Sequence, residues 1–486
     1  GATVSNVSIS SNNNYYMAYV DASGTVAGDV TVEDVVVKVN DKEVAVKWVD
    51  DSVDVHTGTF TLTEDGDYIV TVEYKDRSAN EMTKYTSNRL TLDTKAPTIN
   101  VSNIKINSAN KDEKYGFTIT ANDINLDATS FKPVLTATIR NEDGSYGTKT
   151  VSLGEMKTVE AGKTYTFTVD NLEDDAVYSL VCTLKDMSGN AYSKVALSDG
   201  KEYEEVRFSI NRNGSTFAVD KNTDTLVNQY YVYSVDEDVV IEEVNVDPVE
   251  TYVVKLNGEA LTEGTDYTST LSDKAGEWSK RTYVISKELF KSEGEYSIVV
   301  ESTDKAETTA YSDVKNLNVS FVVDQTAPVL TISGLENGGR YQVEEQTVTV
   351  IPTDDGGRLY SIKVIVLNSD GEPLKDANGK DISVRFEMSG EEFLTYLTEN
   401  NGKITFTVPE GLENQVQIIC NDCAVNADGE TNEYNETYTK VTVSQSGWII
   451  FYANKPLFYG SIAGVLLLVG GIIFLIFFKK RKKESK

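Results

Sequence analysis

The stretch that decides the fold is Gly66-Asp67-Tyr68-Ile69-Val70-Thr71-Val72-Glu73-Tyr74-Lys75-Asp76-Arg77-Ser78-Ala79-Asn80. Apolar and aromatic side chains alternate with polar ones from Tyr68 to Tyr74, which predicts a half-buried antiparallel strand. The Asp-x-x-x-Asn that follows predicts a turn, because short side-chain acceptors and amides satisfy the backbone groups of loops. We therefore interpret these Asp and Asn residues as turn-formers and not as catalytic acids.

The same strand and turn recur in three further segments, at 176–190, 294–308 and 413–426. The Asp of the turn recurs at intervals of 110, 118 and 118 residues, at Asp76, Asp186, Asp304 and Asp422. A period this regular indicates that one unit is repeated four times. We predict domains at 1–94, 95–214, 215–325 and 326–445.

Each unit also contains an earlier hairpin, in which a strand leads into a turn rich in Asn, Asp and Gly. These hairpins lie at 36–41, 136–144, 253–258 and 361–371. Helix is scarce, but Ser389-Gly390-Glu391-Glu392 matches a capping box and predicts a short helix, and Ser286–Phe290 predicts a helical turn. Roughly 110 residues with many short strands are typical of a two-sheet sandwich.

The first and third junctions between units share the pattern Asp-x-x-Ala-Pro, at 93–97 and 324–328. Proline fixes φ and stiffens such a linker, so neighbouring units should not swing freely. The second junction, at 208–214, has no proline, and we expect more bending there.

The C-terminal end predicts a membrane anchor. Leu457–Phe478 is 22 residues without a charge, and at ~1.5 Å per residue it spans roughly 33 Å, which is enough for a hydrocarbon core. Five cations follow at once, and such runs stay on the cytoplasmic side. The aromatic belt of the outer face would be Trp448, Phe451, Tyr452 and Tyr459.

We thus predict a juxtamembrane segment at 446–456, a transmembrane helix at 457–478 and a cytoplasmic basic tail at 479–486. The chain would be a single-pass type I protein of the cell membrane, with its N-terminal region extracellular and the lipid bilayer as its partner. It begins with Gly1 and shows no signal-peptide pattern, so we expect a fragment or a mature form of a longer chain.

The formal net charge is −31. The basic tail at 479–486 carries +5, so residues 1–478 carry about −36. A surface this acidic repels nucleic acid, and we predict no nucleic-acid partner. Three cysteines are few for an exported chain of this size, which favours a bacterial surface protein whose domains fold on core burial alone.

The repeated strand also fits a tyrosine corner, in which a Tyr follows an acidic-x-Gly/Ala-x run. Glu64–Tyr68 and Asp174–Tyr178 match it, Glu293–Tyr296 keeps the Gly and the Tyr, and the fourth unit departs with Asn414 at the Tyr position. With the Asp-x-x-Ala-Pro junctions, residues 1–445 resemble the tandem bacterial immunoglobulin-like repeats of Gram-positive surface proteins. The chain lacks the Leu-Pro-x-Thr-Gly sorting signal of many such proteins.

The resemblance implies an all-β fold of four tandem immunoglobulin-like β-sandwich domains in a row, followed by one C-terminal transmembrane α-helix. It also implies an extracellular stalk, adhesin module or spacer. The antibody-type cysteine would fall at inward strand positions that are not Cys here, so no inter-sheet disulfide is expected; they are Val70, Leu180, Ile298 and Val416.

The sequence offers little for catalysis. His56 is the only histidine, and we interpret it as a surface or half-buried residue of a strand. We interpret Cys182 as a small buried hydrophobe. Cys420 and Cys423 form a Cys-x-x-Cys pair where the repeated strand enters its turn, and they are candidates for a local disulfide. We predict that the chain is not an enzyme.

We predict no catalytic, cofactor-binding or metal site. No EF-hand spacing is present, and Asp354–Gly357 has the spacing of an ordinary turn. Ions bound between domains at Asp93 or Asp324 stay an open alternative, as do isopeptide cross-links.

The predicted function is a membrane-anchored extracellular repeat protein that serves as a cell-surface stalk or adhesion module. One alternative is an adhesin that binds a carbohydrate or host protein through a single domain, with the fourth unit as the candidate. A second alternative is a spacer for an enzyme domain before residue 1. The sequence names no glycan or protein ligand.

Overall fold

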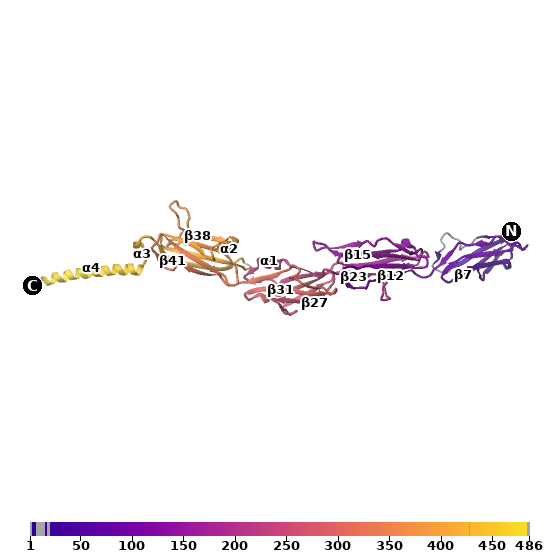
Figure 1. The fold of residues 1–486 in the computed structure, drawn as a ribbon, viewed down its shortest axis with the longest axis horizontal. Coiled ribbons are helices and arrows are strands. Elements are labelled where there is room, and N and C mark those ends of the chain that lie inside the picture. The colour runs from indigo at the N-terminus through magenta and orange to yellow at the C-terminus, as the bar shows by residue number, and fades with distance from the viewer. Residues whose placement is uncertain (1, 6–14, 17–19, 427, 484–486) are drawn as a thin grey trace.

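The computed structural model describes residues 2–5, 15–16, 20–426 and 428–483. It shows four β-sandwiches in a row, with the helix α4 (Lys455–Lys483) at the C-terminal end (Figure 1). The predicted fold class is confirmed: the chain consists of four tandem immunoglobulin-like sandwiches and one apolar helix.

The second sandwich shows the topology most fully. One sheet has the order β17-β18-β14-β12 and continues into β21 and β22, and the other has the order β13-β23-β19-β15-β16. The edge strand β13 pairs parallel to β23, while the hairpin strands pair antiparallel, as in immunoglobulin sandwiches. The elements are β12 (Thr98–Ser102), β13 (Ala109–Asn110), β14 (Phe117–Asn122), η2 (Ala128–Ser130), β15 (Lys132–Arg140), β16 (Tyr146–Val151), β17 (Lys157–Glu160), β18 (Thr164–Val169), β19 (Ala176–Lys185), β20 (Ala191–Tyr192), β21 (Val195–Ala196), β22 (Glu202–Tyr203) and β23 (Val206–Ile210).

The first sandwich repeats this plan with sheets β1-β3-β7-β6 and β10-β9-β4-β5 and a short third sheet, β2-β11-β8. Its elements are β1 (Ala2–Ser5), β2 (Tyr15–Tyr16), β3 (Val20–Gly28), η1 (Val32–Asp34), β4 (Val35–Val39), β5 (Lys42–Glu43), β6 (Lys47–Ser52), β7 (Val55–Leu62), β8 (Gly66–Tyr68), β9 (Val70–Tyr74), β10 (Tyr85–Thr86) and β11 (Leu90–Leu92).

The third sandwich inserts a helix, α1, between its first strands. The sequence analysis did not predict this helix, which Asp220 caps by accepting from the Thr223 N–H at 2.9 Å. The elements are β24 (Thr216–Val219), α1 (Lys221–Gln229), β25 (Tyr231–Val232), β26 (Val239–Asn245), β27 (Val249–Leu256), β28 (Glu259–Ala260), β29 (Tyr267–Ser272), β30 (Ser279–Ile285), η3 (Lys287–Phe290), β31 (Gly294–Asp304), β32 (Thr309–Tyr311) and β33 (Val319–Val323).

The fourth sandwich carries the longest strands and the predicted helix, α2. The elements are β34 (Val329–Ser333), β35 (Arg340–Tyr341), β36 (Glu345–Thr353), β37 (Leu359–Leu367), β38 (Val384–Ser389), α2 (Gly390–Glu399), β39 (Ile404–Pro409), β40 (Gly411–Val425), β41 (Thr431–Val443) and α3 (Gly447–Ala453), followed by α4. The capping-box prediction was wrong in one respect: the Ser389 side chain caps nothing. Ser389 is the N-cap residue of α2 and also the last residue of β38, and the chain turns into the helix through Gly390 at a φ of +60°.

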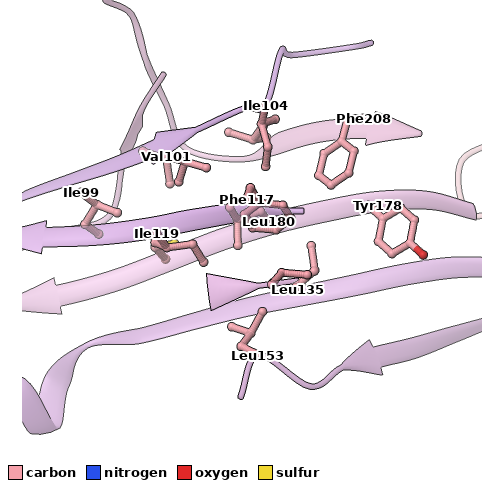
Figure 2. Close-up of a cluster of buried hydrophobic side chains, with 14 of the residues drawn as sticks. Ile99, Val101, Ile104, Phe117, Ile119, Leu135, Leu153, Tyr178, Leu180 and Phe208 are labelled. Atoms are coloured by element: carbon pink, nitrogen blue, oxygen red, sulfur yellow. The ribbon is translucent and has the colours of Figure 1, made fainter. Parts of the chain in front are cut away.

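Each sandwich has its own buried core of side chains from both sheets. In the second, Tyr178 stacks on Phe208 with ring centroids 5.4 Å apart, among aliphatic side chains (Figure 2). The inward positions predicted from the repeat are all buried, namely Val70, Leu180, Ile298 and Val416. Cys182 is buried in the same core, as predicted.

The tyrosine corners form where the sequence predicts them. Tyr68, Tyr178 and Tyr296 each donate from the phenol O–H to the backbone oxygen four residues earlier, at 2.7 to 2.9 Å. In the fourth domain Asn414 takes the place of the tyrosine, and its amide donates to the Pro409 oxygen at 3.4 Å. A side-chain donor therefore closes the corner in all four domains.

Candidate functional site at the domain junctions

Each junction places one short polar side chain five residues before the first strand of the next domain. Asp93 precedes β12, Asp324 precedes β34, and Asn211 precedes β24. Two further side chains from the next domain contact this side chain. One lies at the end of the strand that pairs with the first strand, or just after it. The other comes from the turn that recurs in every unit. The three junctions are therefore built from equivalent positions.

At the first junction Asp93 meets Asp123, which follows β14, and Asp186, which follows β19. One oxygen of each carboxylate lies within 4.8 Å of the others. Asp93 Oδ1 accepts from the Lys95 N–H at 3.1 Å, while Asp93 Oδ2 is buried and has no hydrogen-bond partner among the described residues. The Asn190 amide donates to Asp186 Oδ2 at 2.7 Å and to the Asp93 backbone oxygen at 2.8 Å, so it joins the two domains.

The third junction repeats this arrangement with Asp324, Asp354 and Asp422, again within 4.8 Å. Asp324 Oδ1 accepts from the Thr326 N–H at 3.1 Å, and Asp324 Oδ2 has no partner in the part of the chain that the structure describes. The bridging amide is now Asn432, which donates to Asp422 Oδ2 at 2.8 Å and to the Asp324 backbone oxygen at 3.0 Å.

Glycine allows the backbone to approach the third-junction cluster. A Cβ on Gly357 would lie 1.9 Å from Asp324 Oδ2 and 2.5 Å from Asp354 Oδ2. The two carboxylate oxygens therefore converge on the same small space beside this residue. Neither oxygen of Asp354 has a hydrogen-bond donor among the described residues.

The clustered carboxylates are electrostatically unfavourable as they stand. Burial raises the pKa of Asp123 to about 6, and the neighbouring Asp93 and Asp186 add to this rise. At the third junction burial raises the pKa of Asp354 to about 6 and that of Asp422 to about 7, again with repulsion from the other carboxylates. Both clusters favour a positive partner, whether a proton or a metal ion.

The middle junction is built from the equivalent residues but with amides. The Asn211 Nδ2 group donates to Asn245 Oδ1 at 2.7 Å and to Asp247 Oδ2 and Asp304 Oδ2, both at 3.1 Å. Asn245 Nδ2 donates to the same Asp304 oxygen at 3.0 Å. Each buried carboxylate oxygen that faces the centre of this junction thus accepts a hydrogen bond.

Further bonds between the second and third domains surround this network. Lys305 Nζ donates to the Asn107 oxygen at 2.6 Å, Lys111 Nζ to the Glu307 oxygen at 3.0 Å, and the Trp278 indole N–H to the Thr138 oxygen at 2.9 Å. Side-chain hydrogen bonds therefore connect the two domains at the junction that lacks proline. The expectation of more bending there considered only the linker and not these bonds.

The third junction is also joined by backbone pairing. Strand β25 of the third domain pairs parallel to β33 and bridges to β40 of the fourth domain, where Val232 faces Val425. One sheet thus runs through both domains. Neighbouring domains contact each other through more than their linkers.

The structure places the candidate residues of the sequence analysis apart from these clusters or at their edge. Cys420 and Cys423 are free thiols on the extended strand β40. Side chains three positions apart on a strand point to opposite faces, so Cys420 lies in the core and Cys423 is half-buried on the other side. A disulfide between them would require this strand to bend, and the pairing stays a prediction.

His56 lies on β7, where both of its ring nitrogens have partners. Nδ1 lies 2.6 Å from Asp50 Oδ1 and Nε2 lies 3.2 Å from the Val30 oxygen. The side chain is buried, so its interpretation as a surface or half-buried residue was wrong, and both ring nitrogens are engaged and not available to activate a nucleophile.

Sequence reasoning did not single out Asp123, and it took Asp354 as part of an ordinary turn. A signal was present: each lies 30 residues after the junction aspartate, Asp93 or Asp324. Aligning the units on their junctions would have brought both pairs to the same positions.

The C-terminal end carries a second candidate surface, which faces lipid if the helix is inserted. In the described part of the chain one helix, Lys455–Lys482, is long and apolar enough to cross a membrane, and no part of the protein covers it. Rings pack around Phe458 at the helix start, with centroids 5.0 to 6.4 Å away: Trp448, Phe451, Tyr452 and Tyr459. The four aromatic residues predicted for an outer belt therefore gather at one end of the helix.

No family model and no curated protein matches the chain. Among solved structures it is similar to the complex of Dpr2 Ig1-Ig2 with DIP-Theta Ig1-Ig3, at 8% identity over 63% of this chain and 94% of that one, with a TM-score of 0.34. It is also similar to the eight N-terminal Ig domains of Down Syndrome Cell Adhesion Molecule, at 12% identity over 91% of this chain and 49% of that one, with a TM-score of 0.25. This chain thus matches about half the length of that fragment.

A third similar structure contains fibronectin(III)-like modules of Clostridium thermocellum CbhA, at 13% identity over 47% of this chain and 96% of that one, with a TM-score of 0.21. These scores are low, and we assign the fold from the sheet order and the tyrosine corners. The resemblance to Gram-positive repeats stays a prediction.

Proposed function

We propose that the chain is a membrane-anchored extracellular stalk or adhesion module. The observation that carries this proposal is the uncovered apolar helix α4 at one end of a linear series of sandwiches (Figure 1). A helix of this kind is stable only when lipid or another protein covers it. The sandwiches would then extend away from the bilayer, with the boundaries predicted from the repeats.

The polar flanks of α4 support one orientation. Lys479, Lys480, Arg481 and Lys482 are exposed at its C-terminal end, and cytoplasmic segments are enriched in such cations. The aromatic cluster lies at its other end, next to the fourth sandwich. The sandwiches would therefore be outside and the basic tail inside.

Insertion is tested by placing charge in the centre of α4. Leu467 and Ile472 are 77% and 56% exposed, and an arginine at the centre of a membrane helix costs about 2.5 to 3.5 kcal/mol. We expect Leu467→Arg/Ile472→Arg to leave the membrane pellet during an alkaline carbonate wash, whereas the wild-type chain stays. Val159→Arg/Val314→Arg, at exposed sandwich positions, is the matched control and should stay in the pellet.

Orientation is tested by protease treatment of intact cells that express the full chain with an epitope after Lys486. We expect the protease to remove the sandwiches and to leave a protected fragment that contains α4 and the epitope. An epitope that is digested while the sandwiches survive would overturn the orientation. A wild-type chain extracted by carbonate would overturn the anchor.

A second candidate function is adhesion through the fourth domain. The segment 368–383 between β37 and β38 stands off this sandwich (Figure 1), while the equivalent turns in the other three domains are short. Bridges between Leu367 and Pro373 and between Lys375 and Asp381 shape it into an arm. If a glycan or matrix protein binds the full chain, replacing the arm by the two-residue Asn-Gly turn seen at Asn257-Gly258 should abolish that binding.

A further inference from the structure

We propose that the first and third junctions each bind one divalent cation of the calcium class, and that the middle junction binds none. The proposed ligands are Asp93, Asp123 and Asp186 at the first junction. At the third junction they are Asp324, Asp354 and Asp422. The inference does not depend on membrane insertion, because it concerns only contacts between the sandwiches.

The first observation is a buried carboxylate oxygen without a partner in each cluster. Asp93 is 1% exposed and Asp324 is 3% exposed, and the Oδ2 atom of each receives no hydrogen bond from the described residues. The other oxygen of each accepts a backbone N–H two residues on, which fixes the side chain so that Oδ2 faces the other carboxylates. Buried polar atoms almost always have a partner, so the missing one is a ligand that neutralises charge.

The second observation is the size and chemistry of the sites. Ca²⁺ binds oxygen at about 2.3 to 2.6 Å, so two oxygens on one ion lie at most about 5 Å apart. The separation limit of 4.8 Å within each triad satisfies this condition. All three ligands are carboxylates, which suit Ca²⁺ or Mg²⁺ and not Zn²⁺, for which Cys and His are the usual ligands. We assign Ca²⁺ because the clusters are buried, whereas Mg²⁺ loses its waters reluctantly and usually keeps several of them.

The third observation is the fixed geometry around the third cluster. The backbone N–H of Ala424 donates to Asp422 Oδ1 at 3.0 Å and Asn432 Nδ2 to its Oδ2 at 2.8 Å, which orients this carboxylate. Gly357 leaves the space in which the Asp324 and Asp354 oxygens converge. Both Asp354 oxygens are unpartnered, so this residue is able to bind in a bidentate manner.

The middle junction is a control that the chain itself provides. Asn211 replaces the junction aspartate and Asn245 replaces the aspartate at the second strand, while Asp304 is kept. The Asn211 Nδ2 group occupies the centre of this junction, and its two hydrogens are shared among three oxygens at 2.7 to 3.1 Å. The amides of Asn211 and Asn245 donate hydrogen bonds to the carboxylates, and the aspartates at the equivalent positions of the outer junctions have no N–H to donate. An ion is needed only where all three positions are aspartate.

A shared proton is the competing partner for the outer clusters. A proton neutralises one carboxylate but takes up no calcium, so the amount of calcium bound distinguishes the two partners. Binding measurements at pH 7.5 therefore separate the two explanations.

The experiment is a calorimetric titration of CaCl₂ into the chelated full chain in nanodiscs at pH 7.5. We expect two equivalents to bind. Asp93→Asn/Asp123→Asn and Asp324→Asn/Asp354→Asn should each bind one equivalent, and the combined four-substitution variant should bind none. These variants reproduce the residues of the middle junction, so they are expected to fold, which far-UV circular dichroism checks. Asp370→Asn/Asp428→Asn, which removes two exposed charges elsewhere in the fourth domain, is the matched control and should bind two.

The outcomes decide each part of the proposal. Absence of saturable binding to the wild-type chain overturns it, and so does binding that the four-substitution variant retains. If the wild-type chain binds one equivalent of calcium, and only one of the two double variants abolishes this binding, the proposed site at the other junction is wrong. MgCl₂ is titrated in parallel, and we expect at least tenfold weaker binding. Equal affinity for Mg²⁺ overturns the assignment to calcium.

Discussion

Asn211 and Asp324 occupy the same position at successive junctions, and only Asp324 leaves a buried oxygen without a hydrogen-bond partner. The amide of Asn211 satisfies the carboxylates that face it, whereas the carboxylate of Asp324 adds to them. One type of junction thus exists in two chemical versions within a single chain. This relationship divides the junctions into one that is tied by protein hydrogen bonds and two that need a cation.

The middle junction should be destabilised by a charge at its centre. Asn211→Asp removes the donors to Asp247 and Asp304 and adds a third buried carboxylate. Because uncompensated buried charges are costly, we expect a loss of about 3 kcal/mol in the free energy of unfolding without calcium. Urea unfolding followed by fluorescence detects it through Trp278, whose indole N–H bonds across this junction.

The matched control for this change is Asn213→Asp. Asn213 donates to Asp175 at an exposed position, so the same charge change there should cost less than about 1 kcal/mol. Equal effects of the two substitutions would contradict the assigned role of Asn211.

The third junction should depend on the absence of a side chain at Gly357. Gly357→Ala would place a Cβ 1.9 Å from Asp324 Oδ2, so the carboxylates would be forced apart. We expect this variant to bind one calcium ion fewer than the wild-type chain. Gly356→Ala is the control: it strains the backbone at a φ of +106° but meets no atom within 4 Å, and it should keep both ions. Loss of an ion in both variants would point to the loop conformation and not to the cluster.

A tyrosine corner should stabilise its own domain. Tyr296→Phe removes the O–H that donates to the Ser292 oxygen at 2.7 Å, and we expect a loss of about 1 kcal/mol. Hydrogen exchange in β31 measures the local opening free energy. Tyr311→Phe removes only a long, exposed O–H bond to Glu301 at 3.4 Å, and it should alter exchange by less than about 0.5 kcal/mol. An unchanged β31 in the Tyr296 variant would show that the corner does not stabilise the domain.

The three thiols should differ in reactivity. Burial raises the pKa of Cys182 and of Cys420 to about 12, against about 8.5 for a free cysteine, so the thiolate fraction at pH 8 falls roughly a thousandfold or more. Burial also raises the pKa of Cys423, but this thiol is half-buried. In the native reduced chain we expect maleimide to label Cys423 first, faster as the pH rises, and all three cysteines in urea.

Intact mass under non-reducing conditions tests the disulfide that the sequence analysis proposed. A chain 2 Da lighter, with Cys420 and Cys423 both protected in urea, would support that bond. Rapid native labelling of Cys182 would contradict its place in the core.

The four β-sandwiches could be predicted from the sequence, because the alternation of apolar and polar residues in strands and the residue types of turns are local properties that recur in each unit. The period of Asp76, Asp186, Asp304 and Asp422 located the four units, and Tyr68, Tyr178 and Tyr296 located their corners. Helix α1 was not predicted because Lys221–Gln229 contains only two apolar side chains, Leu226 and Val227, which are too few to reveal a helical period. Ser389 occupies the predicted N-cap position of α2, but its side chain makes no capping hydrogen bond.

The junction clusters could be predicted only in part, since they combine residues from two domains. Asp93 and Asp324 were recognised as possible ion ligands, but Asp186 and Asp422 were interpreted only as turn-formers. Both roles hold for Asp422, which accepts the Ala424 N–H and also faces Asp324. The sheet that joins Val232 to Val425 depends on how two domains dock, and no local pattern encodes it.

We propose a linear, anchored array that calcium stiffens at its outer junctions. Electron microscopy of single full chains in nanodiscs tests it most directly, with the angles between neighbouring sandwiches measured with calcium and after chelation. We predict one unbranched rod that leaves the disc from the fourth sandwich. We also predict that chelation broadens the angles at the first and third junctions and leaves the middle angle unchanged. Broadening confined to the middle junction, or sandwiches folded back on the disc in calcium, would contradict the account.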